Sequence, residues 1–203
     1  MEEPRGVSRL EAALRGMALE LDRARTPWAL VGGLAVSARA EPRFTRDVDV
    51  AVAVNDDQEA EQLARGLVAS GYHVLATLEQ ESVGRLATVR LATPGGDPSA
   101  VVVDLLFASS GVEREIVREA ELLEVLPGLR VPVARCGHLL ALKILSVSPE
   151  RPQDLIDILS LVGQAAPADV DQARETAALI VARGYGRGRD LAGELEKHLR
   201  FHR

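Results

Sequence analysis

Residues 44–52 read FTRDVDVAV, in which Asp47 and Asp49 interrupt a largely apolar run. The alternation predicts a β-strand, and residues two apart on a strand point to the same face of the sheet. Two carboxylates on one face repel each other, and a charge inside an apolar strand is costly unless it is paired or bound to a metal. The pair therefore indicates either a solvated strand end or a site that binds cations.

A glycine pair, Gly32 and Gly33, follows a short apolar strand and precedes a helical pattern, with 13 residues separating it from Asp47. Glycines let the backbone approach a ligand closely, and the start of a helix offers free N–H groups and a positive dipole end to phosphate. Thr45 and Arg46 lead into the aspartate strand and could contact the same phosphates. The alternative for the glycines is tight packing between strand and helix.

Asp104 is the single charged residue in VVVDLLF, residues 101–107, which we expect to form another strand. Three carboxylates on neighbouring strands suit a site with two Mg²⁺ ions, because Mg²⁺ prefers oxygen ligands and keeps waters and substrate phosphates in its shell. In that scheme Asp104 is also the general base that accepts the proton of the attacking hydroxyl. The alternative is an ion pair with one of the many arginines.

Lysine is rare in this chain: of 24 Lys and Arg residues, only Lys143 and Lys197 are lysine. Lys143 lies in the apolar stretch LLALKIL, so its ammonium must reach water or an anion. It could contact the triphosphate or base of a nucleotide. It could equally pair with Asp154 or Asp157, which share one face of an expected helix. Asp154 is itself a candidate for the nucleotide site.

The pattern of apolar residues predicts an α/β chain with a mixed sheet, followed by a mainly helical half. We divide it into a core, 1–111, and a helical region, 112–203. The expected helices of the core are 8–25, 34–40 and 56–71, and its expected strands are 28–33, 46–54, 72–78, 84–92 and 101–108. Beyond it we expect a charged helix at 112–123, a hairpin at 122–134 that turns at Pro127–Gly128, and helices near 135–147, 152–163, 168–183 and 187–201.

Composition narrows the functional classes. The formal net charge of −6 argues against a generally basic surface that coats nucleic acid, although it allows a local basic patch. A single cysteine, Cys136, excludes an internal disulfide framework and a cysteine-rich metal site. The sequence contains no apolar run long enough to cross a bilayer and no apolar signal-peptide region near its start. We therefore expect a cytoplasmic protein that does not bind membranes.

The order of these motifs resembles the DNA polymerase β-like nucleotidyltransferase superfamily, whose pattern is G-[GS], a spacer, D-x-[DE] and a third carboxylate on a later strand. Within it, RFTRDVDV and the segment LLALKILSVSPERPQDLIDILSL resemble the AbiEii/AbiGii-type toxins of bacterial toxin–antitoxin systems. The resemblance implies NTP binding and transfer of a nucleoside monophosphate with release of pyrophosphate. It assigns two Mg²⁺ ions to Asp47, Asp49 and Asp104, and the nucleotide to Gly32, Gly33, Thr45, Arg46, Lys143 and Asp154.

The acceptor stays open at this point. The resemblance implies an RNA, such as the 3′ end of a tRNA, or a protein, and it implies an antitoxin as a candidate partner. A small molecule such as an aminoglycoside or a lincosamide is the alternative, and the net acidity favours it because cationic drugs prefer anionic clefts. A third reading is a non-catalytic binding module that keeps the fold.

Overall fold

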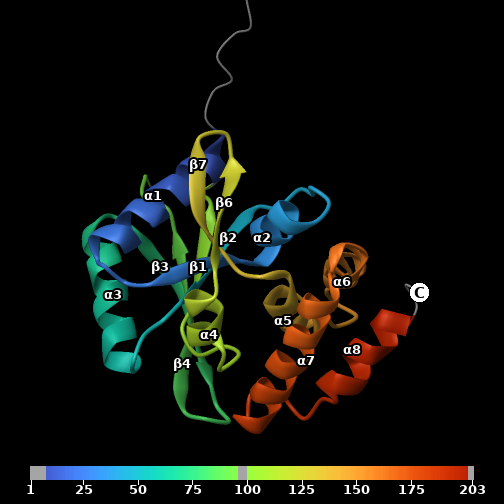
Figure 1. The fold of residues 1–203 in the computed structure, drawn as a ribbon. Coiled ribbons are helices and arrows are strands. Elements are labelled where there is room, and N and C mark those ends of the chain that lie inside the picture. Colours follow the sequence, from blue (N-terminus) through green and yellow to red (C-terminus); the bar gives the residue numbers. More distant parts are fainter. Residues whose placement is uncertain (1–7, 96–99, 201–203) are drawn as a thin grey trace, which may run out of the picture.

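A seven-stranded mixed sheet forms the centre of the computed structural model, which describes residues 8–95 and 100–200 (Figure 1). The strands lie in the order β3-β4-β5-β2-β1-β7-β6. The pairs β2–β5 and β1–β7 are parallel, and the other neighbouring pairs are antiparallel. The strands are β1 (Trp28–Val31), β2 (Asp47–Val52), β3 (His73–Gln80), β4 (Arg85–Ala92), β5 (Val102–Leu106), β6 (Glu121–Leu126) and β7 (Leu129–Val133).

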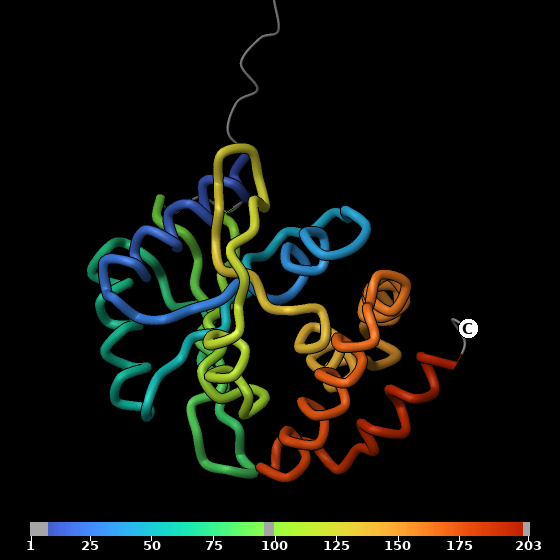
Figure 2. Tube along the Cα trace, in the orientation of Figure 1, coloured from blue at the N-terminus to red at the C-terminus, as the bar shows by residue number. Residues whose placement is uncertain are grey.

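Helices cover both sides of this sheet. In Figures 1 and 2, α1 and α3 lie on one side, whereas α2 and the C-terminal helices α5 to α8 lie on the other. The α/β class with a mixed sheet and a mainly helical second half is therefore confirmed. The helices are α1 (Arg9–Arg23), α2 (Gly32–Arg39), α3 (Asp57–Ala69), α4 (Glu113–Arg118), α5 (Cys136–Ser146), α6 (Pro152–Gln164), α7 (Pro167–Ala182) and α8 (Leu191–Arg200).

Two helices of the core, α1 and α3, begin after side chains that cap them. The Ser8 hydroxyl accepts a hydrogen bond from the Glu11 backbone N–H at 3.1 Å, and α1 follows it. Helix α3 follows Asp56, whose carboxylate accepts from the Glu59 backbone N–H at 2.9 Å. Both helices bury leucines at helical spacing against the sheet, which fixes their rotation about their own axes.

Strand β2 occupies a central place between β1 and β5. Val48 and Val50 are fully buried, while Asp47 and Asp49 point to the opposite face, as the alternation predicts. In the parallel pairing of β2 with β5, Asp49 lies directly opposite Asp104. In the antiparallel pairing with β1, Asp49 lies opposite Val31, the last residue before the glycine pair. The sheet register therefore brings these distant segments together.

The expected helix at 112–123 is wrong in its second half. Helix α4 ends at Arg118, and β6 begins at Glu121. The backbone of β6 pairs with β7, which in turn pairs with β1. Sheet pairing thus overrides the helical pattern of these charged residues, because it satisfies backbone groups that an isolated helix end would leave open.

The hairpin and the C-terminal helices otherwise follow the expected pattern with shifted ends. The turn at Pro127–Gly128 is confirmed, and the hairpin adds two strands to the sheet of the core. The domain division at residue 111 stays a prediction. Helix α8 begins at Leu191 rather than at 187, because Arg187 and Gly188 both have left-handed φ values, of 55° and 70°. Residue 201 of the expected helix lies outside the described residues.

The last four helices pack on one another around α5. Helix α5 contacts α6, α7 and α8, and α2 of the core contacts both α5 and α6. The apolar side chains of α5, including Leu139, Leu140 and Ile144, are fully or almost fully buried. Within residues 8–95 and 100–200, no helix is long and apolar enough to cross a membrane.

Candidate active site

A cavity of about 710 Å³ lies between the sheet and the C-terminal helices. Its walls include the ends of β1 and β2, the loop that precedes β2, parts of β4 and β5, and segments of α5 and α6. Every candidate residue from the sequence lines this cavity. They are Gly32, Gly33, Thr45, Arg46, Asp47, Asp49, Asp104, Lys143 and Asp154.

Burial and neighbouring negative charges act on the Asp49 carboxylate in this cavity. Burial and the neighbouring charges of Asp104 and Asp47 raise its pKa from 3.8 to about 6, against the opposing effects of Lys143 and of a hydrogen bond from the Gly33 backbone N–H. The repulsion between carboxylates that the sequence predicted is therefore present. A divalent cation between these oxygens would remove it.

Asp104 has a partner of its own on the adjacent strand. Arg90 of β4 lies opposite Asp104 of β5, and its Nε and Nη2 donate to the two carboxylate oxygens at 2.8 and 2.7 Å. Asp104 is 7% exposed, whereas the Arg90 side chain is half exposed at the cavity wall. This bidentate ion pair holds Asp104 in one orientation and neutralises one of the three carboxylates.

The glycine pair opens helix α2, so β1 ends at Val31, two residues before the expected strand end. Gly32 has a φ of +63°, and a Cβ there would overlap the Asp49 carboxylate. A Cβ at Gly33 would lie 2.7 Å from the Thr45 hydroxyl oxygen and 2.8 Å from Nη2 of Arg43. Only glycine fits this backbone between Asp49 and the loop before β2. The close approach places the first N–H groups of α2 at the cavity.

Lys143 sits in a buried network of charges and is 7% exposed. Its ammonium lies 2.7 Å from Oδ1 of Asp154 and 2.8 Å from Oδ2 of Asp157, so the alternative that the sequence left open, an ion pair, is present. Lys143 also acts on the charge of Asp49 across the cavity wall. The ammonium is therefore shared between the helix carboxylates and the carboxylates of β2.

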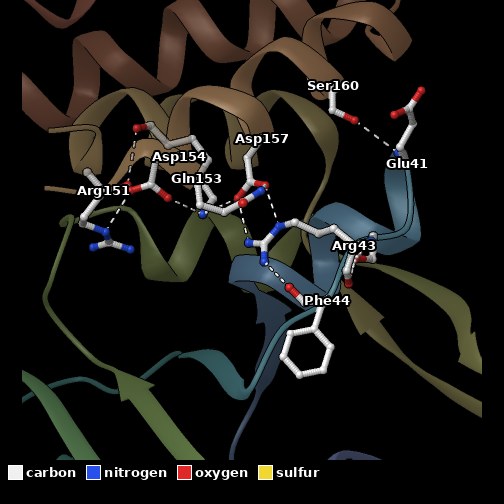
Figure 3. Close-up of polar contacts among 11 residues, drawn as sticks. Glu41, Arg43, Phe44, Arg151, Gln153, Asp154, Asp157 and Ser160 are labelled. Atoms are coloured by element: carbon white, nitrogen blue, oxygen red, sulfur yellow. Dashed lines mark hydrogen bonds and ion pairs between the residues drawn. The ribbon is translucent and has the colours of Figure 1, made fainter. Parts of the chain in front are cut away.

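Two arginines complete the network, as Figure 3 shows. Nε of Arg151 lies 2.9 Å from Oδ2 of Asp154. Arg43 donates through Nε and Nη2 to the two oxygens of Asp157, at 2.6 and 2.8 Å. Burial would raise the pKa of Asp157, but hydrogen bonds from Arg43 and Lys143 outweigh it and lower the pKa. Asp157 thus joins the loop before β2 to helix α6, and Arg43 is engaged there rather than free for phosphate.

Among the residues of the cavity that the sequence did not single out are Phe44 and Arg90. Arg90 left a signal, because it is a charge between Val89 and Leu91 in an apolar strand. Its partner could not be found without the register of β4 against β5. Arg187 belongs to ARGYGRGRD, residues 182–190, which predicts a flexible joint between helices or, as the alternative, a contact with RNA, and burial together with other arginines lowers its pKa. Arg90 and Arg187 add positive charge to the wall around the aspartates.

The donor chemistry of the cavity suits a hard divalent cation, since carboxylate oxygens are the ligands that Mg²⁺ prefers. The raised pKa of Asp49 follows from burial and from the like charges of Asp104 and Asp47. In the part of the chain that the structure describes, no three His, Cys, Asp or Glu side chains are already gathered to hold a metal. Asp104 is turned toward Arg90 instead. The residues therefore fit such an ion once Asp104 exchanges its partner.

A family sequence model matches residues 13–201 of this chain, and its description is "Nucleotidyl transferase AbiEii toxin, Type IV TA system". The chain belongs to the AbiEii family. The likeness stated from the sequence, which rested on residues 28–162, is thereby confirmed over nearly the whole chain. No curated protein matches this AbiEii-family chain.

Solved structures share the fold. An antigenic nucleotidyltransferase-like protein from Paracoccidioides brasiliensis is 22% identical, with a TM-score of 0.54 over 93% of this chain and 92% of that one. ANT(2″)-Ia, solved in complex with adenylyl-2″-tobramycin, is 15% identical, with a TM-score of 0.52 over 85% of this chain and 97% of that one. At these identities the likeness shows a common fold alone.

Family membership makes this protein a nucleotidyltransferase. Enzymes of this fold generally use divalent metal ions, which agrees with the donor chemistry of the cavity. The type IV toxin–antitoxin description implies a partner antitoxin. The identity of the acceptor and of the nucleotide is a separate question, which the geometry of the cavity addresses.

Proposed function

We propose that this AbiEii-family protein transfers a nucleoside monophosphate from an NTP to an RNA, with the 3′ end of a tRNA as the first candidate, or to a protein. One observation carries the proposal: Asp47, Asp49 and Asp104 line one cavity with the N-terminus of α2. Carboxylates that hold cations, beside backbone N–H groups that donate hydrogen bonds to phosphate, are what nucleotidyl transfer needs.

The nucleotide would lie with its phosphates at Gly32 and Gly33, where α2 begins. The positive end of the helix dipole favours anions there, beside the Gly33 N–H that already donates to Asp49. Thr45 and Arg46 flank the same wall, and Arg187 adds a cation from the C-terminal part of the chain. Lys143 reaches this wall from α5 and balances part of the carboxylate charge.

Asp47, Asp49 and Asp104 would hold two Mg²⁺ ions, which supply neutralisation of the phosphate charge and activation of the attacking oxygen when bound. In the transfer, Asp104 accepts the proton of the acceptor hydroxyl, whose oxygen forms a bond to the α-phosphorus. The bond from the α-phosphorus to the bridging oxygen breaks, and pyrophosphate leaves. Arg90 must release Asp104 for this step, and it can then meet the negative charge of the phosphates.

A small-molecule acceptor is the second candidate. Two observations favour it: the formal net charge of −6, which suits cationic drugs, and the shared fold of ANT(2″)-Ia with its adenylylated tobramycin. The cavity volume of about 710 Å³ lies within the range of small-molecule sites, which span roughly 300–1,000 Å³. The acceptor must therefore be identified by a direct comparison.

The test is transfer of label from each of four α-³²P-labelled NTPs in the presence of Mg²⁺. Total tRNA, total cell protein and an aminoglycoside–lincosamide mixture are offered in separate reactions. We expect label in the tRNA fraction and its loss when Mg²⁺ is chelated. Label in the antibiotic fraction alone would replace the RNA acceptor by the second candidate. Absence of transfer in every reaction, together with no NTP binding by calorimetry, would contradict the proposal.

A matched pair of variants separates chemistry from folding. Asp49→Asn removes one cation ligand and should lower transfer by at least about 100-fold, the cost of losing one group that stabilises charge in a transition state. Asp171→Asn removes an equally charged, exposed carboxylate on α7 that does not line the cavity. Its transfer rate should equal that of the wild type.

A further inference from the structure

Phe44 stands out on the rim of the active-site cavity because its side chain is 79% exposed. Among the aromatic residues of the described chain, the others are buried, at 7% exposure or less: Trp28, Tyr72, Phe107 and Tyr185. The hydrophobic effect favours burial of a phenyl ring. The loop before β2 nevertheless presents this ring to solvent on the rim of the cavity that Asp47, Asp49 and Asp104 line.

The loop is built to hold Phe44 in this position. Arg43 donates from Nη1 to the Phe44 carbonyl oxygen at 3.0 Å, while its Nε and Nη2 grip the buried Asp157. The Glu41 backbone N–H donates to the Ser160 hydroxyl at 3.2 Å. Figure 3 shows the ring pointing away from this network, on the side opposite α6. Both anchors of the backbone, at Glu41 and Arg43, therefore lie just before this exposed side chain.

A cation lies over the same ring. The guanidinium carbon of Arg46 is 5.6 Å from the centroid of the Phe44 ring, within cation–π distance. Arg46 itself is exposed and lines the cavity. Proteins bind nucleotides with an aromatic ring and an arginine next to a site for phosphates. The ring stacks on the base, and the cation contacts a phosphate or the other face of the base.

We propose that Phe44 and Arg46 form a stacking platform for a nucleobase at the mouth of the cavity. The proposal rests on the proposed function, since it supplies the base-binding part of a site whose phosphate-binding part is the start of α2. The base can belong to the NTP or to the terminal nucleotide of a single-stranded RNA acceptor, and the chemistry of stacking is the same for both. If Phe44 instead contacted a protein partner, its ring would have no part in binding a nucleobase.

Phe44→Leu removes the aromatic face and keeps an apolar side chain on a loop whose anchors are unchanged. Because the ring is exposed, the unfolding midpoint should stay within about 1 °C of the wild type. Equilibrium binding is measured with ATP and the other NTPs, with inorganic triphosphate, and with an adenylate octaribonucleotide. Leu122→Ala, which alters an exposed side chain on β6 that does not line the cavity, is the control.

We expect Phe44→Leu to weaken the binding of the base-containing ligand about 5- to 150-fold, the range for loss of one aromatic–base stack. Inorganic triphosphate should bind as it does to the wild type. Phe44→Trp should restore binding, and its new indole fluorescence should be quenched by the ligand that stacks. If NTP binding falls, the base is that of the NTP, and if only the octaribonucleotide binds less tightly, the base is that of the acceptor.

Three results would overturn the platform. They are unchanged binding of both base-containing ligands, an equal loss for inorganic triphosphate, and a weakened antitoxin complex with unchanged nucleotide binding, which would make Phe44 a protein contact. A wild-type protein that binds neither NTP nor triphosphate would instead refute the proposed function. The two failures are therefore distinct.

Discussion

The raised pKa of Asp49 predicts that removing its charge stabilises the empty protein. Asp49→Asn keeps the shape of the side chain and can still accept the hydrogen bond from Gly33. The change in pKa from 3.8 to about 6 corresponds to at most about 3 kcal/mol, at about 1.4 kcal/mol for each tenfold change in proton affinity. Asp49 retains partial contact with solvent, so we expect a gain of about 1–2 kcal/mol at pH 7.5.

The dependence on pH has a definite sign. The folded protein keeps a proton on Asp49 up to about pH 6, whereas the unfolded chain releases it near pH 3.8. The stability that this proton contributes is complete below pH 3.8 and is lost as the pH rises through 6. Asparagine carries no charge at any pH. The advantage of Asp49→Asn should therefore be largest above pH 7 and should shrink toward pH 4.

Urea unfolding at pH 7.5 and pH 4.5 in the presence of a chelator measures both effects, with the buried Trp28 as a fluorescent reporter. Asp57→Asn is a control of opposite sign: despite its partial burial, hydrogen bonds from Arg85 and the Leu86 backbone N–H lower the pKa of Asp57, so its loss should destabilise at pH 7.5. An Asp49→Asn protein that is less stable than the wild type at pH 7.5 would refute the reasoning.

Three further substitutions test other parts of the cavity. Lys143→Met leaves two buried carboxylates with less positive charge, so it should cost about 3–5 kcal/mol in urea unfolding at pH 7.5 and less at acid pH. Gly32→Ala forces a Cβ into the space of the Asp49 carboxylate, and calorimetry should show loss of NTP binding. Arg90→Gln frees Asp104 from a competing cation, so Mg²⁺ should bind at least about fivefold more tightly in a calorimetric titration. Equal or weaker Mg²⁺ affinity would show that Arg90 does not compete with Mg²⁺ for Asp104.

The strands and helices of the core could be predicted from local sequence patterns, because each shows regularly spaced apolar residues and a clear start or stop signal. The alternation around Asp47 and Asp49 fixed which side chains share a face, and the structure agrees. The candidate residues could also be named, because a charge or a glycine within an apolar run is conspicuous. Their meeting in one cavity follows from the parallel register of β2 with β5, which sequence patterns do not specify.

The prediction that failed and the contacts that could not be predicted have a common physical cause. Strand β6 exists because β7 is available to pair with it, and the Arg90–Asp104 pair exists because β4 lies beside β5. Both depend on contacts between segments that are apart in sequence, which local propensity cannot encode. Phe44 was overlooked for a related reason: a single phenylalanine looks like core until the segment just before it is seen anchored to α6. Functional positions are where such local rules tend to fail.

Binding of divalent cations tests the central claim most directly. Mn²⁺ can be titrated in the presence of α,β-methylene-ATP and followed by electron paramagnetic resonance, because Mn²⁺ takes the same oxygen ligands as Mg²⁺. We predict nucleotide-dependent binding of two ions by the wild type, weaker binding of one ion by Asp104→Asn, and loss of both by Asp49→Asn. Identical Mn²⁺ binding by all three proteins would contradict the account, because the carboxylates would then not be the ligands.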